Sequence, residues 1–484
     1  MLTETANRDS RISYWLRVRE FAVPPSMIET ATTRRSVGDW AGACAAAGID
    51  VDLNLRSVAC AHGRELASRI RADLRHLAPD LLRWHLPRIA PDGLLRPGLT
   101  MALARYDGGG RDGPCPPQLV IRTPPAWADG GQRISLALWD GSLSEAGARR
   151  HPHPHPSRRF RLDLHRHLWD ARRAGELRSR AGADRPPPGG DPGPERRLPG
   201  PHRFAVDRWA DEAGILLRAE GLPAGPVTVR CGARHRLLLT PVAKGDGDGN
   251  AYGYGDGEAD ENGDGPPVLR ISATPSDRAA TLPVLPDAAV WVPPDLELLR
   301  AGAIGAGRLH PLVASALAPD HTTVSASRDP DPTGGPRLVE CRGARHRIGL
   351  VNGVLAALDH DPDEIRREEL LVALTGTPLP CLRAIDEAHR RPHCLTGVRE
   401  RLVHGDITGA LAVVEGLLGP GAVLRNGALR DELEAAARRR VTHGLFRAGL
   451  IGGGPRSAPD RVPPDRAPSR SGGRTSRPRR ATLR

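Results

Sequence analysis

Residues 54–77 read NLRSVACAHGRELASRIRADLRHL. Apolar side chains recur in this stretch at spacings of three and four, which places them on one face of an α-helix. Asp52 or Asn54 is a suitable N-cap, and Pro79 follows the last apolar position. The pattern predicts one continuous helix over the whole stretch, near the start of the fold.

Strand-like runs follow this helix in the first part of the chain. They are Leu99–Tyr106, Gln118–Thr123, Arg133–Trp139 and Arg159–His165. In the last run Phe160, Leu162 and Leu164 alternate with polar residues, which is typical of a strand with one buried face. Helices followed by strands predict an α+β fold rather than a wound parallel sheet.

A second set of helices is predicted near the C-terminus. Asp361-Pro362-Asp363-Glu364 combines an N-cap, a proline in the first turn and acidic residues at the positive end of a helix. Further helical patterns cover 382–390, 396–404, 407–418 and 427–448. The expected fold class is therefore multidomain α+β, with short antiparallel sheets, an N-terminal helical segment and a C-terminal helical bundle.

The chain has 484 residues, too many for a single hydrophobic core. The stretch AGADRPPPGGDPGPERRLPGPHR, residues 181–203, is rich in Pro and Gly and reads as a linker. The predicted organisation is an N-terminal α+β domain over 1–178, a linker over 179–203, a β-rich domain over 204–360 with polar inserts at 243–266 and 319–336, a helical subdomain over 361–452 and a disordered Arg-rich tail over 453–484.

The β-rich domain contains two segments of similar sequence. Residues 227–239 read VTVRCGARHRLLL and residues 338–350 read LVECRGARHRIGL. A glycine-containing turn between two apolar runs predicts a hairpin in each segment. The functional interpretation is a pair of anion-binding sites formed by Arg234, Arg236, Arg345 and Arg347. The alternative, which the sequence favours, is one hairpin type used twice with solvated arginines.

Soft metal ligands gather in one short segment. Cys381, His389, His393 and Cys394 lie within 14 residues and form a candidate zinc site. Their spacing matches no known zinc template, and Pro392 separates the two histidines. The favoured alternative is a helix–turn–helix with buried Cys and surface His. The sequence therefore predicts no cofactor, and it assigns the HPHPHP stretch at 151–156 to a linker rather than to a loose metal site.

Motifs of the large enzyme classes are missing from the sequence. Residues 108–113 match G-x-G-x-x-G, but Pro114 and Pro116 follow where a helix would have to start. The sequence favours a non-catalytic intracellular interaction or scaffold protein. The alternative is an unrecognised enzyme or anion-binding protein that uses the His/Arg-rich hairpins, so whether the protein is an enzyme stays open.

Charge and cysteine content bear on partners and location. Lys244 is the only lysine, so the basic composition reflects arginine usage and is weak support for nucleic-acid binding. Residues 455–484 carry nine Arg and two Asp, and weak non-specific binding of nucleic acid by this tail is the alternative to a solvated end. The expected partner is another protein. Seven scattered cysteines, with no signal-peptide or membrane-span pattern, predict a cytoplasmic protein.

Overall fold

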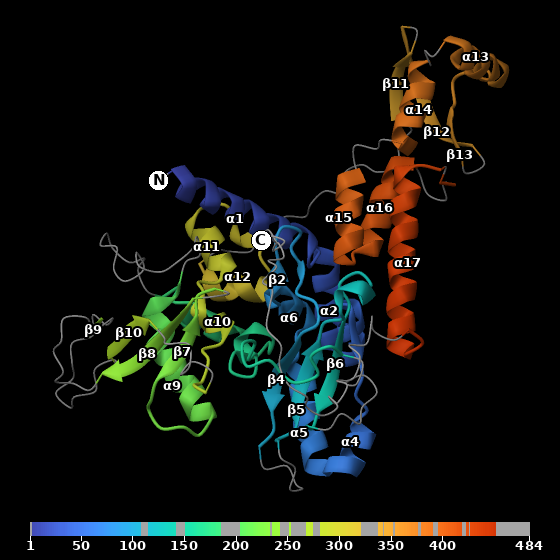
Figure 1. The fold of residues 1–484 in the computed structure, drawn as a ribbon. Coiled ribbons are helices and arrows are strands. Elements are labelled where there is room, and N and C mark those ends of the chain that lie inside the picture. The colour runs from blue at the N-terminus through green and yellow to red at the C-terminus, as the bar shows by residue number, and fades with distance from the viewer. Residues whose placement is uncertain are drawn as a thin grey trace, which may run out of the picture.

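The structure is a computed structural model. It describes residues 2–107, 115–141, 151–184, 204–232, 235–242, 251–252, 268–273, 281–320, 337–341, 343–351, 354–375, 379–390, 395–418, 423–424 and 426–451. These residues form a mixed α+β protein with several short, mainly antiparallel sheets and a helical C-terminal part, which confirms the predicted fold class (Figure 1). The predicted Arg-rich tail, the 108–113 glycine motif and most of both polar inserts lie outside the described residues.

The N-terminal part places helices around a four-stranded sheet (Figure 1). Its helices are α1 (Leu2–Phe21), α2 (Pro25–Ser36), α3 (Trp40–Ala46), α4 (Leu55–His62), α5 (Arg64–His76), α6 (Pro79–His85) and α8 (Leu177–Arg180), with short 3-10 turns η1 (Ala126–Ala128), η2 (Arg166–Leu168) and η3 (Ala174–Glu176). Its strands are β1 (Ile49–Val51), β2 (Arg88–Ile89), β3 (Leu94–Leu95), β4 (Thr100–Arg105), β5 (Gln118–Arg122) and β6 (Ile134–Trp139).

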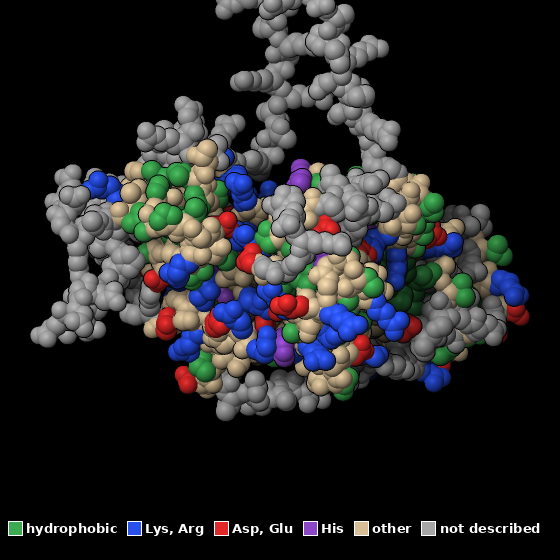
Figure 2. All heavy atoms as spheres, turned by 90° about the horizontal axis from the view of Figure 1, so that it is seen from below, with side chains coloured by type: hydrophobic (Ala, Val, Ile, Leu, Met, Phe, Trp, Pro, Cys, Tyr) green, Lys and Arg blue, Asp and Glu red, His purple; other side chains and the backbone are tan. Residues whose placement is uncertain are grey.

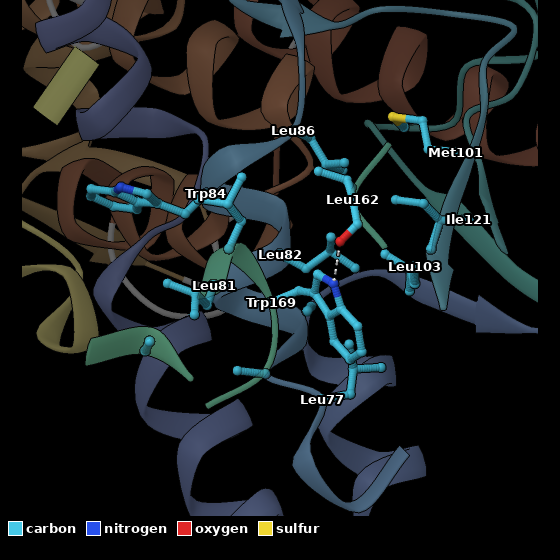
Figure 3. Packing of buried hydrophobic residues seen from close by; sticks show 14 of the residues in the cluster. Leu77, Leu81, Leu82, Trp84, Leu86, Met101, Leu103, Ile121, Leu162 and Trp169 are labelled. Carbon is cyan, nitrogen blue, oxygen red and sulfur yellow. Dashed lines mark hydrogen bonds between the residues drawn. The ribbon is translucent and has the colours of Figure 1, made fainter. Parts of the chain in front are cut away.

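The sheet has the order β1-β6-β5-β4. Strands β4, β5 and β6 pair antiparallel and confirm three of the predicted strand runs. β1 pairs with β6 in parallel and forms the sheet edge next to the C-terminal helices. Leucines of α6 and apolar residues of β4 and β5 pack around Trp169, which is fully buried (Figure 3).

The predicted helix over 54–77 is two helices. Gly63 has a φ of 93°, a left-handed conformation that ends α4 and starts α5 in a new direction. Asn54 caps α4 as predicted, because its side chain accepts hydrogen bonds from the backbone of Arg56 and Ser57. The apolar spacing continues across Gly63 because both helices bury their apolar side chains in the same core.

The predicted strand over 159–165 is wrong. The backbone N–H groups of Phe160, Leu164 and His165 each bond to the carbonyl three residues earlier, which makes a chain of turns. Phe160 and Leu162 are still buried, so the alternation correctly indicated which side chains face the core. The Leu162 carbonyl accepts a hydrogen bond of 3.0 Å from the indole of Trp169 (Figure 3).

The middle part builds a second core around another sheet. It contains η5 (Val206–Arg208), α9 (Trp209–Ala219), β7 (Val227–Arg230), β8 (Arg236–Val242), β9 (Ala251–Tyr252), β10 (Val268–Ala273), α10 (Asp287–Val290), α11 (Pro294–Arg300), η6 (Ala306–Arg308) and α12 (Pro311–Leu317). Trp209 is fully buried in this second core. Helices α11 and α12 instead pack into the N-terminal core, where Asp295 bonds to Arg19 and to the indole of Trp84.

The C-terminal part combines a three-stranded sheet with helices. It contains β11 (Arg337–Cys341), β12 (Ala344–Val351), β13 (Val354–Ala357), α13 (Pro362–Thr375), α14 (Pro380–Arg390), α15 (Leu395–His404), α16 (Ile407–Leu418) and α17 (Ala428–Ala448). The five helices confirm the predicted helical ranges. Asp361 caps α13, since its side chain accepts a hydrogen bond of 3.0 Å from the backbone of Asp363.

The C-terminal helices contact the N-terminal part through two tight loops. The turn between α15 and α16 lies against the loop before β6, and a Cβ added at Gly405 would lie 2.1 Å from the carbonyl oxygen of Gly131. Gly405 also has a φ of 88°. The buried guanidinium of Arg83 donates a hydrogen bond of 2.9 Å to the carbonyl of His404 and another to the carbonyl of Gln132. It therefore holds the two loops against each other.

We predict that Gly405→Ala disrupts this docking. A methyl group at this position requires a left-handed backbone and overlaps a backbone oxygen, so we expect a loss of about 2 kcal/mol or more in unfolding free energy. Gly397→Ala, inside α15 with open space around it, is the matched control and should be neutral or stabilising by up to about 1 kcal/mol. Urea unfolding of both variants measures the difference, and equal stabilities would contradict the tight contact.

A buried carboxylate joins the N-terminal part to the middle part. Glu212 of α9 accepts hydrogen bonds from Arg180, at 2.6 and 2.8 Å, and lies 3.3 Å from the imidazole of His165. Burial alone would raise the pKa of Glu212, but the neighbouring His165 and the hydrogen bonds from Arg180 overcome it and lower that pKa to about 2. The ionised carboxylate is therefore the form that stabilises the fold.

This geometry predicts an acid-sensitive contact. Because the folded pKa of Glu212 is depressed, its contribution is present above the ordinary pKa near 4.5 and is lost as the pH falls towards 2. Glu212→Gln should therefore lose stability at pH 6 while its stability falls less between pH 5 and pH 3 than that of the native protein. Glu176→Gln is the control, because Glu176 forms an exposed ion pair with Arg173. Parallel acid dependence in all three proteins would exclude this role.

Candidate metal centre

Three soft ligands converge in the C-terminal part. Cys341 is the last residue of β11, His360 lies in the turn before α13, and Cys381 is in the first turn of α14. One ligand atom of each residue lies within 4.8 Å of the others. Among the described residues this is the group of three whose atoms could hold a metal ion. The ligands come from segments separated by up to 40 residues, so the fold rather than a local motif brings them together.

Local structure explains why each ligand lies where it does. β11 and β12 form an antiparallel hairpin in which Cys341 pairs with Ala344 across a turn containing Gly343, whose φ is 81°. β13 pairs with β12 on its other side and leads into the turn that holds His360. Pro380 starts α14 and suits the first helical position, which fixes Cys381 one residue later.

The site is almost completely shielded from solvent. Cys341, Cys381 and His360 have exposed fractions of 1%, 0% and 9%. The two sulfurs belong to a small apolar cluster with Leu379, Val339, Ala357 and Leu382. The ligand atoms of a tetrahedral zinc site lie about 3.5–4 Å from one another. A small inward movement of these side chains would therefore supply three of the four ligands, two Cys and one His.

The imidazole of His360 is oriented as in a metal site. Its Nδ1 lies 3.6 Å from a carboxylate oxygen of Glu364, one turn along α13. Its Nε2 is buried and makes no hydrogen bond within the described part of the chain. Metal-bound histidines typically use one ring nitrogen for the metal and give the other N–H to a carboxylate. His346 stacks on His360 with ring centroids 4.1 Å apart, which fixes the plane of the ring.

The thiol of Cys381 is a weak acid in the absence of a cation. Burial, together with the hydrogen bond to Cys341, raises the pKa of Cys381 to about 11. Its sulfur is therefore protonated at neutral pH unless a positive charge is present. A divalent ion supplies that charge and displaces the thiol protons, which is the usual coupling between metal binding and thiol ionisation.

The metal site predicted from the sequence shares one residue with this group of three. Cys381 is a member of the cluster, whereas the side chain of His389, on α14, and both His393 and Cys394 lie outside the described residues. Cys341 and His360 were missed because they are 40 and 21 positions away from Cys381. The available signal was the position of Cys341 two residues before the repeated GARHR segment, which starts at Gly343.

The repeated GARHR segments form two separate hairpins, as predicted. β7 pairs with β8, and β11 pairs with β12, but in different sheets at opposite ends of the molecule (Figure 1). Within the described residues, β8 begins at Arg236, whereas β12 begins at Ala344. The two arginine pairs therefore do not form one common site.

The predicted anion-binding arginines have unequal surroundings. Arg347 is neutralised by Asp359, which it meets through hydrogen bonds of 2.7 and 3.1 Å. Arg236 and Arg345 are exposed, and Arg234 lies outside the described residues. On the face drawn in Figure 2, basic and acidic side chains are interspersed, so this face has no continuous basic surface for nucleic acid.

The HPHPHP stretch is packed rather than extended as a linker. His151 is buried, and its ring nitrogens lie 2.9 Å from the carbonyl oxygens of His153 and Thr123. His155 contacts the edge of Trp139. Nδ1 of His151 also accepts a hydrogen bond of 3.2 Å from the backbone N–H of His153, so its lone pair is engaged within the protein rather than directed at a metal ion.

Comparisons with protein-family models, with curated proteins and with solved structures find no match to this chain. Within the described ranges, none of the helices has the length and apolar character needed to cross a membrane.

The burial of the two thiols predicts a definite order of alkylation. Cys60 is exposed, whereas Cys341 and Cys381 are buried, so a brief pulse of iodoacetamide on the native protein should label Cys60 first. Peptide mass spectrometry locates the label, and Cys60→Ser should remove that early modification. Early labelling of Cys341 or Cys381 would show that the cluster is open to solvent.

Proposed function

We propose that the protein is a non-catalytic scaffold whose C-terminal part, residues 337–451, is an interaction module stabilised by a structural zinc ion. The observation that carries the proposal is the convergence of Cys341, His360 and Cys381 from three separate segments. Two thiolates and one imidazole are ligands that favour zinc over magnesium or calcium. A site shielded from solvent suits a structural ion better than a catalytic one, which keeps an open coordination position.

The size of the local core supports a structural role for the ion. Among the described residues, the cluster that holds the two sulfurs has three buried members, Cys341, Leu379 and Cys381. Ile348 of β12 and Ile385 of α14 belong instead to the eight-residue core of the C-terminal helices. Small units with little apolar surface of their own commonly gain stability from a metal. The sheet, α13 and α14 form the outer end of the C-terminal part (Figure 1).

Exposed apolar residues support protein binding as the task of this module. Among the described residues, eight of the twelve exposed large apolar side chains lie between Leu338 and Leu450. Leu370 on α13 is 67% exposed. Large apolar side chains concentrated in one unit are a feature of surfaces that contact another protein.

The zinc proposal predicts one ion per chain. After reconstitution with Zn²⁺ and removal of excess metal, the native protein should retain one equivalent by atomic emission. Cys341→Ser, His360→Gln and Cys381→Ser should each lose it, whereas Cys44→Ser and Cys60→Ser should keep it. Cys394→Ser reports whether the residue predicted from the sequence contributes a further ligand.

A spectroscopic measurement covers the case in which a ligand variant fails to fold. Co²⁺ added to the native protein should produce the near-ultraviolet thiolate-to-metal band of sulfur coordination, and Zn²⁺ should abolish it. A mass lower by two hydrogen atoms would indicate a disulfide between Cys341 and Cys381. Either that mass or the absence of the band would overturn the zinc proposal.

The interaction part of the proposal has its own test. A photo-crosslinking amino acid at Leu370 should give a discrete adduct in cells, and the adduct should be lost when His360→Gln is added. The same amino acid at Val37, which is 76% exposed on the N-terminal part, is the control. The absence of an adduct at Leu370, or equal adducts at both positions, would exclude the module as the interaction surface.

A further inference from the structure

A second feature lies where the C-terminal helices meet the N-terminal part. A pocket of about 600 Å³, a volume that includes open solvent, is bounded by α17, the α15–α16 turn and the loop before β6. Four arginines line it: Arg83, Arg133, Arg439 and Arg440. None of the described residues that line it is acidic. A pocket of this composition favours an anion.

The four arginines differ in what they can offer a ligand. Arg83 is fully buried and gives its N–H groups to backbone carbonyls, so it contributes charge but few free donors. Burial lowers the pKa of Arg83 to about 10, which leaves the guanidinium cationic at neutral pH. Arg133 is bonded to Asp50. These two residues provide the positive floor of the pocket.

The free donors come from α17. The Nη2 atom of Arg439 is buried and makes no hydrogen bond within the described part of the chain. Arg440 is exposed, and no carboxylate of the described residues pairs with it. Guanidinium groups bind phosphoryl and carboxylate oxygens through two parallel N–H donors, so both side chains are suited to an oxyanion.

The carboxylates close to the pocket in the sequence are bonded to other groups. Asp50 is bonded to Arg133 and His443, and Asp129 to Gln132. Asp406, between the lining residues Gly405 and Ile407, is bonded to Arg401. The cationic side chains on α17 therefore suit an anion such as a phosphate monoester, which carries about −1.5 to −2 at neutral pH.

The surrounding backbone is shaped for close approach. Gly130 and Gly131 face the pocket, and a side chain at Gly130 would collide with His443 at 2.5 Å. Gly405 on the opposite wall touches Gly131. These glycines therefore allow the loop before β6 to approach the α15–α16 turn and α17 closely, which sets the shape of the pocket between them.

We propose that this pocket binds a small oxyanion, a phosphoryl or carboxylate group of a metabolite, through Arg439 and Arg440. Because α17 belongs to the C-terminal part and the loop to the N-terminal part, the bound anion holds the two parts together. This site is separate from the zinc ligands and does not depend on the proposed function.

The test is calorimetric titration with inorganic phosphate, phenyl phosphate and succinate against a chloride control of equal ionic strength. Arg439→Gln and Arg440→Gln should each raise the dissociation constant about tenfold or more, since each removes a charge-assisted contact. Arg438→Gln is the matched control, because Arg438 lies on the same helix with a side chain 71% exposed and does not line the pocket. It should change the constant less than about twofold.

The relative affinities for the three anions distinguish a phosphoryl ligand from a carboxylate ligand. Tighter binding of the phosphates than of succinate identifies a phosphoryl ligand, and the reverse identifies a carboxylate. The ligand that binds should also raise the melting temperature of the native protein but not that of Arg439→Gln. If none of the three anions binds the native protein, or if all three arginine variants weaken binding equally, the proposed site is excluded.

Discussion

One buried guanidinium holds four segments of the chain together. Arg83, at the centre of α6, donates hydrogen bonds to the carbonyls of Ala22, Ala47, Gln132 and His404. The first two of these residues directly follow α1 and α3, Gln132 precedes β6, and His404 ends α15. Burying a cation is unfavourable unless its donors are satisfied, so the four segments must stay in place together. The position of the C-terminal helices, and with it the pocket beside α17, depends on this arrangement.

The same principle recurs elsewhere in the interior. Asp295 accepts hydrogen bonds from Arg19 and from the indole of Trp84. Asp80 lies 3.0 Å from the imidazole of His310, and Glu212 accepts a hydrogen bond from Arg180. Each contact joins elements that are distant in the sequence. Directional bonds of this kind add little net stability but select one arrangement among many compact ones. Arginine suits the task because its planar fork reaches several acceptors at once.

Local patterns in the sequence predicted the elements better than their partners. The cap at Asp361, the strands Gln118–Arg122 and Ile134–Trp139, and the C-terminal helices follow from spacing and capping alone. The break at Gly63 was not predicted, since the apolar spacing runs through it. The segment 159–165 shows that alternation indicates burial without indicating hydrogen-bond pattern. Cys341 and His360 were not predicted as ligands, because only the folding of β11, β13 and α14 brings them to Cys381.

The union of distant segments also has a consequence for biosynthesis. Arg83 and His404 are 321 residues apart. A ribosome that adds about 5–20 residues per second needs roughly 15 to 60 seconds to synthesise the chain between them. During that interval the N-terminal part exposes the surface that α15 and α17 later cover, and the guanidinium at its centre is hydrated. The nascent chain therefore remains open to chaperones and proteases until its last helices emerge.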